Sequence, residues 1–275
     1  MFGFLEAFFY TMLMKNFFLF LLLVVLFLAN SCASNVIFTD NFNSKTQQID
    51  TSIWKLCPYA NNAWSQHFKY VNGYQNVRIE DGNLVLKAIK EDGNYKNGGV
   101  KSSISFPNFT RVEVRAKLNK KVRGGFPAIW QMPVGAPTWP KGGEVDIMEW
   151  IQGTPNQIYQ TVHSYYINET SGTTGATNLN PDKNFDVTQY HIYAADRTDE
   201  AVIFYVDGKE TFRYENKNLS DDKLQFPFNK YNFNIILNFS LGGLLNGNNT
   251  WPGAIYDEDL PGEMWVDWVK VTKIK

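Results

Sequence analysis

Apolar and polar residues alternate with a period of two along several short segments of the chain. The alternation is clearest in residues 83–88, 111–116 and 202–206, which are rich in β-branched and aromatic side chains. Such segments are typical of β-strands that bury one face. Asp-Gly and Asn-Gly pairs stand between strand-like segments, as hairpin turns require. No long segment has the 3.6-residue period of an amphipathic helix, so we predict an all-β fold.

The arrangement of these strands follows from their number and spacing. Many short strands with regular turn signals and no intervening helices predict an antiparallel two-sheet β-sandwich rather than a barrel of alternating strands and helices. A chain of 275 residues, 44% of them hydrophobic, is long enough to bury the core of one such domain. Residues 168–184 and 241–261 have the composition of long surface loops, and we expect both to line a binding groove.

The amino-terminal region has the pattern of an export signal. Residues 17–29 form an unbroken apolar run of 13 after Lys15, whereas a membrane-spanning helix needs about 20 apolar residues. The sequence that ends this run, 29–32, resembles a bacterial lipobox, in which the cysteine carries the lipid. We therefore predict a signal peptide over 1–32, with Met14 as an alternative start. The mature protein is expected at the outer membrane or cell surface of a bacterium, anchored through Cys32.

Charge and ligand composition exclude several function classes. The formal net charge is -1 and no cluster of Lys and Arg stands out, so we do not expect nucleic acid as a partner. Lipidation of Cys32 would leave Cys57 as a lone buried thiol. The three histidines do not cluster with cysteines, so a catalytic zinc site lacks its ligands. We predict no cofactor for catalysis and a monomeric chain.

Aromatic residues make up 16% of the chain, with 8 Trp and 14 Tyr. Flat rings pack on the apolar faces of sugars while their polar edges keep hydrogen bonds, so this abundance fits a glycan-binding groove. Aromatic residues also favour strands, and composition alone leaves that explanation equally open.

Three acids, Glu144, Asp146 and Glu149, interrupt an otherwise apolar segment. Residues two apart on a strand share a face, so Glu144 and Asp146 point the same way. The odd spacing of five turns Glu149 to the opposite face unless the strand accommodates one extra residue. We therefore predict a β-bulge near Ile147 or Met148, which brings all three acids to one side.

With the bulge, the carboxyl groups of Glu144 and Glu149 can approach to about 5–6 Å, the separation of a retaining glycosidase. In that mechanism one ionised carboxylate attacks the anomeric carbon and the other, held protonated, donates to the leaving oxygen. The charge of Asp146 between them raises the pKa of a neighbouring acid and keeps it protonated near neutral pH. Taken alone, the same spacing also fits a solvated strand face or a cation site.

Several motifs in order along residues 36–273 resemble glycoside hydrolase family 16, the laminarinase and lichenase group. The acids match its E-x-D-x-x-E strand with the bulge. The other matching segments are 125–133, 160–163, 190–193, 204–208, 238–243 and 264–271. The resemblance implies a jelly-roll sandwich with a concave substrate groove, and 33–275 as the catalytic domain.

The resemblance also implies roles for single residues. Glu144 is then the nucleophile, Asp146 its assistant and Glu149 the acid/base. Trp130 is a sugar platform and His163 a neighbour of the acid/base, although a lone histidine can also be a core residue bonded to the backbone. The remaining candidates for contact with sugars are Phe126, Trp150, Trp64, Trp139 and Trp251. A structural calcium on the convex face is implied as well, with Asp267 as a candidate ligand.

The substrate class stays open between two sugars. Phe126 stands where many β-glucanases have Trp, and Trp150 follows the acid/base where Tyr or His is common, so the two departures lie near the sugar subsites. We predict a retaining endo-glycosidase that cleaves internal β-linkages of a polysaccharide or oligosaccharide. A β-1,3- or mixed-linkage glucan is the first expectation. An endo-β-1,4-galactosidase of the gut-bacterial type, acting on mucin-type O-glycans or poly-N-acetyllactosamine, is the alternative.

Two further functions use the same fold or the same residues. A non-catalytic lectin-like module is one, but two buried acids destabilise a binding protein that has no use for them. Transglycosylation differs only in whether a sugar or water enters the second step.

Overall fold

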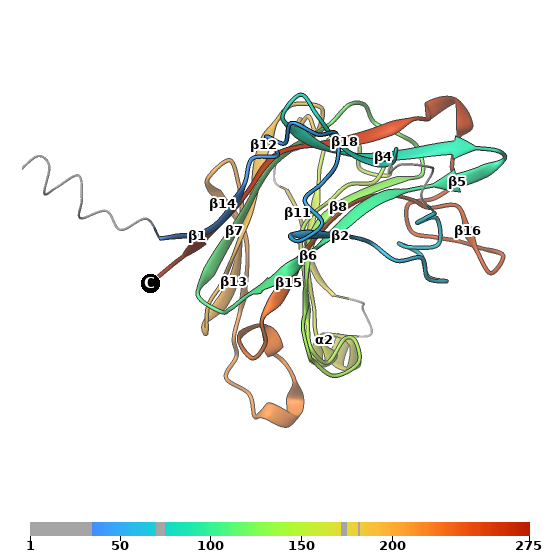
Figure 1. Ribbon diagram of the computed structural model, residues 1–275. Helices are drawn as coiled ribbons and strands as arrows, with labels where there is room; N and C mark the ends of the chain where they lie inside the picture. The colour runs from blue at the N-terminus through green and yellow to red at the C-terminus, as the bar shows by residue number, and fades with distance from the viewer. Residues whose placement is uncertain (1–34, 70–74, 172–174, 181) are drawn as a thin grey trace, which may run out of the picture. The chain divides into compact units, whose positions relative to one another are not determined.

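The chain folds into two antiparallel β-sheets that pack face to face (Figure 1). The computed structural model describes residues 35–69, 75–171, 175–180 and 182–275. The signal peptide, the alternative start and the lipid-attachment cysteine, all predicted within 1–32, lie outside the described residues. The folded unit is Val36–Lys275.

Among the described residues, one sheet has nine strands, in the order β14-β13-β12-β7-β18-β4-β3, with β1 beside β18 and β5 beside β4. Its strands are β1 (Val36–Asp40), β3 (Val77–Glu80), β4 (Asn83–Glu91), β5 (Asn94–Lys96), β7 (Thr110–Leu118), β12 (His191–Arg197), β13 (Ala201–Val206), β14 (Lys209–Glu215) and β18 (Gly262–Lys273).

The other sheet has seven strands, in the order β11-β10-β9-β8-β15-β6-β2. Its strands are β2 (Trp54–Leu56), β6 (Gly98–Phe106), β8 (Gly125–Pro133), β9 (Glu144–Glu149), β10 (Tyr159–His163), β11 (Ala176–Leu179) and β15 (Phe233–Leu241). The remaining elements are the hairpin β16 (Leu244–Leu245) and β17 (Asn248–Asn249), the helix α2 (Tyr165–Ser171) and the short 3-10 helices η2 (Asp221–Lys223), η3 (Pro227–Asn229) and η4 (Asp257–Asp259).

The core lies between the two sheets, and strand alternation fills it. Strand β7 alternates strictly: Val112, Val114 and Ala116 are buried, while the residues between them are partly exposed. Strand β15 lies between β8 and β6 and is buried along its whole length. One face of β15 therefore meets the core, and its polar residues are buried on the other face. The predicted all-β, antiparallel two-sheet sandwich is confirmed.

The two predicted loops differ in outcome. The prediction of a loop over 168–184 is wrong for two parts of it, because 168–171 continue α2 and 176–179 form β11. Strand β11 pairs with the edge of β10, where the Thr161 and Thr177 hydroxyls lie 3.1 Å apart. Such cross-strand Thr pairs stabilise a sheet. The Gly- and Asn-rich composition of this segment had indicated a loop and gave no sign of strand β11. Residues 241–261 are mostly irregular, as expected, apart from β16, β17 and η4.

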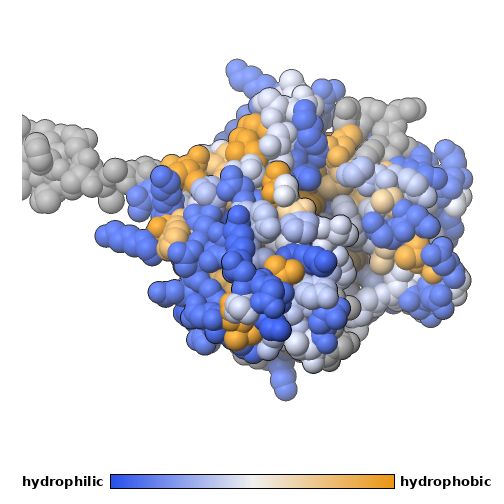
Figure 2. Space-filling model, turned by 90° about the horizontal axis from the view of Figure 1, so that it is seen from below, coloured by the Kyte–Doolittle hydropathy of each residue, from blue (hydrophilic) through white to orange (hydrophobic). Residues whose placement is uncertain are grey.

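The surface carries its apolar side chains in small separate patches among polar ones on the face that Figure 2 shows. Scattered apolar residues of this kind are ordinary on a folded surface.

No helix within the described residues is long and apolar enough to cross a membrane. Cys57 is buried in the folded unit, and this burial raises the pKa of its thiol to about 12.

Candidate active site

Strand β9 carries the predicted bulge. On β8, Ala128 pairs with Glu149 and Trp130 pairs with Asp146, so the two-residue step on β8 faces a three-residue step on β9. Strand β10 shows the same shift against β9. The extra residue falls at Ile147 or Met148, which confirms the predicted bulge. Both of these side chains are buried in the hydrophobic core, so they hold this part of the strand in place.

The bulge brings the three acids into one cavity of about 210 Å³. Glu144, Asp146 and Glu149 all line it. The other lining residues are Ala63, Trp64, Phe126, Ala128, Trp130, Asn238, Trp251 and Pro252. They come from β8, from β15 and from the segments around 63–64 and 251–252. A cavity with aromatic walls and a few convergent polar groups is the usual form of a small-ligand site.

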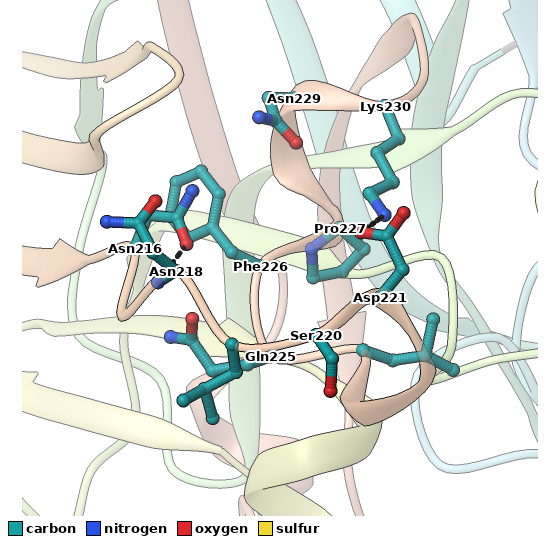
Figure 3. Close-up of a pocket in the computed structure, with 11 residues that line it drawn as sticks. Asn216, Asn218, Ser220, Asp221, Gln225, Phe226, Pro227, Asn229 and Lys230 are labelled. Atoms are coloured by element: carbon teal, nitrogen blue, oxygen red, sulfur yellow. Dashed lines mark hydrogen bonds and ion pairs between the residues drawn. The ribbon is translucent and has the colours of Figure 1, made fainter.

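A second cavity lies beside the connection from β14 to β15 and has a different character (Figure 3). Its walls mix amide and hydroxyl side chains with apolar ones. Its one acid, Asp221, is paired with Lys230 at 2.5 Å. This cavity holds no second acid, so it lacks the groups that acid-base chemistry needs.

Burial dominates the electrostatics of the acid cluster. Loss of hydration raises the pKa of Glu144 to about 8, and the nearby Asp146 charge adds to the rise. Burial likewise raises the pKa of Asp146, and it raises that of Glu149 well above the ordinary range. Hydrogen bonds from Trp139 to Glu144 and from Thr161 to Glu149 act in the opposite direction. The cluster therefore keeps at least one proton near neutral pH, as a general acid requires.

His163 lies at the Glu144 end of the cluster. It pairs with Glu144 across β9 and β10, and its Nε2 is 3.2 Å from Asp146 Oδ2 and 3.9 Å from Glu144 Oε1. Glu149 lies opposite Tyr159 in this register, and the His163 charge also acts on Glu149, so the predicted place beside the acid/base stays a prediction. The histidine is a neighbour of Glu144 and Asp146.

Trp130 faces the acids from the adjacent strand. Its indole Nε1 donates to Asn238 Oδ1 at 2.7 Å, and the Trp64 ring meets it edge to face with centroids 4.9 Å apart. Only 7% of Trp130 is exposed, and that part lines the cavity beside the acids. The indole is thus held rigidly where a sugar ring would pass, and its role as a platform stays a prediction.

Trp251 and Phe126 form another part of the wall. Their rings meet at 88° with centroids 5.4 Å apart, and the Tyr159 ring also packs on Trp251, with centroids 4.8 Å apart. Trp251 is 51% exposed, so a large part of its ring is open to a ligand. Trp139 is exposed as well, at 45%, and its ring lies 5.7 Å from the His163 ring.

Trp150 is not part of the cavity, so its predicted contact with sugar is wrong. The residue is fully buried in the core, and its Nε1 donates to Pro155 O at 3.2 Å. The reason is strand alternation: the residue after Glu149 points to the opposite face of the sheet.

Three residues of the site were missed by the sequence analysis. Asn238 holds Trp130, Thr161 holds Glu149 and Tyr159 holds Trp251. Asn238 had a visible signal, since it is a polar residue inside the apolar strand 233–241. Thr161 lies in the matching segment 160–163, but its contact with Glu149 and the contact of Tyr159 with Trp251 join segments distant in the sequence.

Few of the described side chains are placed to bind a metal ion together. In the described part of the chain, one group of three has ligand atoms within 4.8 Å of one another, namely Glu144, Asp146 and His163. Asp267, the predicted calcium ligand, instead forms an ion pair with the guanidinium of Arg115. A calcium ion needs six or more oxygen ligands. The Asp267 carboxylate is instead occupied by the Arg115 cation, so this position does not fit a calcium site.

A two-sheet antiparallel sandwich with three buried acids on one bulged strand, inside an aromatic-walled cavity, defines a class of carbohydrate-active protein. The profile of glycosyl hydrolases family 16 matches residues 64–270. The chain belongs to this family.

Individual relatives point to two kinds of sugar. A keratan-sulfate endo-1,4-beta-galactosidase from Sphingobacterium multivorum is 32% identical over 87% of this chain and 55% of its own length. A glucan endo-1,3-beta-glucosidase A1 from Niallia circulans is 31% identical over 87% of this chain and 38% of its own length. The chain thus spans about half or less of these two relatives.

A solved structure is similar over its whole length. It is described with the words that prominent members of the human gut microbiota express endo-acting O-glycanases to initiate mucin breakdown. The identity is 63%, the TM-score is 0.84, and the match covers 87% of this chain and 100% of that chain.

The raised pKa of Asp146 predicts how stability changes with pH. The unfolded carboxyl loses its proton near pH ~4, whereas the folded one keeps it toward pH 8. The stability that this proton brings is complete below about pH 4 and is lost as pH rises through the folded pKa. Asp146→Asn mimics the neutral acid, so its thermal midpoint should gain on that of the wild type from pH 5 to pH 8. A constant difference between the two midpoints across this range would contradict the assignment.

Proposed function

We propose that this protein is an endo-acting glycoside hydrolase that cleaves internal β-galactosidic linkages in mucin-type O-glycans or related poly-N-acetyllactosamine chains. The 63% identity to a structure described among endo-acting O-glycanases carries the choice of substrate. The endo-β-galactosidase relative supports the same sugar. The acid cluster supports hydrolysis over plain binding. Buried carboxyls lower the stability of the fold, and a protein that only binds sugar has no need of them.

The proposed reaction has two steps. In the first, a Glu144 carboxylate oxygen bonds to the anomeric carbon, while the bond to the leaving oxygen breaks and that oxygen takes the Glu149 proton. In the second, Glu149 takes a proton from water, whose oxygen replaces Glu144 at the same carbon. Asp146 lies between the two glutamates on the strand, and its negative charge raises the pKa of both. The Thr161 hydrogen bond orients Glu149 for both transfers.

Phe126 is the proposed reader of the sugar. Glucose and galactose differ only at O4, which is equatorial in glucose and axial in galactose. A side chain that packs flat against the sugar face from which the axial O4 rises rejects galactose. Phe126 is smaller than the Trp that many glucanases place there, so it leaves space for this hydroxyl. Its ring lies against Trp251 in the cavity, so the space it leaves is next to the acids.

The direct test uses the protein without residues 1–32 on defined chains. Poly-N-acetyllactosamine, desialylated mucin O-glycans, laminarin and lichenan are incubated at equal mass, and the new reducing ends and product sizes are measured. We expect internal cleavage of the first two, with galactose at the new reducing end. Cleavage of the glucans alone would overturn the choice of sugar, and binding without cleavage of any chain would overturn the hydrolase.

A β-1,3- or mixed-linkage glucan is the second candidate, which the endo-1,3-β-glucosidase relative favours. Phe126→Trp should shift the ratio of kcat/KM values toward glucan by about tenfold, since shape alone discriminates by that order. The matched control is Phe109→Trp, at an exposed phenylalanine outside the cavity, which should leave the ratio unchanged. An unchanged ratio in Phe126→Trp as well would place the selectivity elsewhere.

We further propose that the protein is exported and held at the membrane by a lipid on Cys32. The apolar run of 17–29 and the lipobox-like sequence support this. Cys32→Ala should move the protein from the membrane fraction to the soluble exported fraction, as measured by fractionation and blotting. Retention of the variant in the membrane fraction would instead support an uncleaved anchor.

A further inference from the structure

One short loop before Glu144 carries an exposed aromatic ring, Trp139, and an exposed cation, Lys141. Trp139 hydrogen-bonds to Glu144 and its ring lies beside His163. Lys141 follows two residues later, and its ammonium lies 5.3 Å from the centre of the Tyr165 ring. His163 ends β10 and Tyr165 begins α2, so the loop contacts this junction at two points.

This loop is fixed in position by its backbone. The amide of Lys141 donates to Thr138 O at 3.1 Å, and the amide of Gly143 donates to Pro140 O at 3.0 Å. Gly142 and Gly143 are buried, and a Cβ at Gly143 would come within 2.9 Å of the Phe228 ring. The position of Lys141 relative to Glu144 is therefore set by tight packing rather than by a free chain.

The charges around Lys141 leave it available to an anion. Within the described residues, no carboxylate lies within the 4.0 Å ion-pair distance of its ammonium, which is exposed. The acid cluster keeps at least one proton because burial raises the pKa values of its members, so it repels an approaching anion less than three full charges would.

We propose that Trp139 and Lys141 form a subsite for a sugar that carries an anionic substituent, a sulfate ester or a carboxylate. The sugar ring stacks on the exposed face of Trp139, and its anionic group meets the Lys141 ammonium over Tyr165. A lysine is a compact point charge without the fork of arginine, so it suits a single anionic oxygen. This inference rests on the proposed function, since it specifies which glycan chains that site accepts.

The test compares one chain in three forms: unsubstituted poly-N-acetyllactosamine, the 6-O-sulfated chain and the sialylated chain, at equal length. The wild type should cut at least one anionic form about three- to fivefold more efficiently in kcat/KM, the order of one partly exposed ion pair. Lys141→Gln should lose that preference while it keeps its rate on the unsubstituted chain. Lys141→Arg should retain most of the preference, and about 0.5 M salt should abolish it in the wild type.

Lys217 provides the matched control. Its ammonium lies 5.6 Å from the ring of Tyr166 on the same helix α2, but it belongs to the segment beside the second cavity. Lys217→Gln should therefore keep the preference. The sulfated and sialylated forms distinguish the two sources of negative charge.

The outcomes separate the two proposals. If the wild type shows no preference for either anionic chain, or Lys141→Gln keeps one, the subsite is overturned while cleavage of the unsubstituted chain still supports the function. If no form is cut, the proposed function fails. The subsite is then judged by the Kd of the sulfated and sialylated chains, which Lys141→Gln must weaken about three- to fivefold for at least one chain and Lys217→Gln must not.

Discussion

Glu144→Gln is expected to abolish turnover, with a loss of about 10⁴-fold or more in kcat, while the protein stays folded. The substitution keeps the shape of the side chain but removes the carboxylate oxygen that bonds to the anomeric carbon. The folded state should be as stable as the wild type or more stable near neutral pH, because a buried acid with a raised pKa is replaced by a neutral amide. Initial rates and thermal unfolding of the same preparation measure both effects.

The control for this variant is an acid of the other sheet. Glu113 on β7 is ion-paired with Lys270, away from the cavity, and Glu113→Gln should leave kcat within about twofold. Binding of an uncut oligosaccharide by Glu144→Gln, with a Kd near the wild-type KM, would show that the cavity is intact. Turnover of Glu144→Gln within a few-fold of wild type would remove Glu144 from the nucleophile's role.

Local periodicity was sufficient to predict the acid cluster. The odd spacing between Glu144 and Glu149 required an extra residue on the strand, and the structure places it at Ile147 or Met148. The same alternation excludes Trp150 from the cavity, since it directly follows Glu149. The sequence thus contained the information on Trp150, and the motif resemblance concealed it.

Contacts between distant strands were not predictable from local pattern. His163 meets Asp146 through the register of β10 on β9, which shifts at the bulge. Asp267 meets Arg115 through the pairing of β18 with β7, between residues 152 positions apart. A charged residue on a sheet face takes its partner from the neighbouring strand, and one sequence does not state which strand that is.

Glu149→Ala is expected to lose activity in proportion to how much the leaving group needs a proton. On a natural chain the departing sugar oxygen is strongly basic, and loss of the general acid should lower kcat/KM by about 10²- to 10⁴-fold. On an aryl glycoside with an acidic phenol the oxygen leaves without protonation, so the first step should be nearly unimpaired. Hydrolysis of the enzyme-bound sugar then becomes slow, because the base that activates water is missing as well.

Azide separates this role from a general loss of structure. Its nitrogen needs no base, and the space left by the Glu149 side chain lies inside the cavity. Azide should therefore accelerate turnover of the aryl glycoside by Glu149→Ala, and the product should be a β-glycosyl azide in which azide has replaced Glu144 at the anomeric carbon. Thr161→Val is the matched control: it removes the hydroxyl that orients Glu149 but keeps the acid, so it should gain nothing from azide. Equal losses on good and poor leaving groups, without azide product, would assign the acid/base role to another residue.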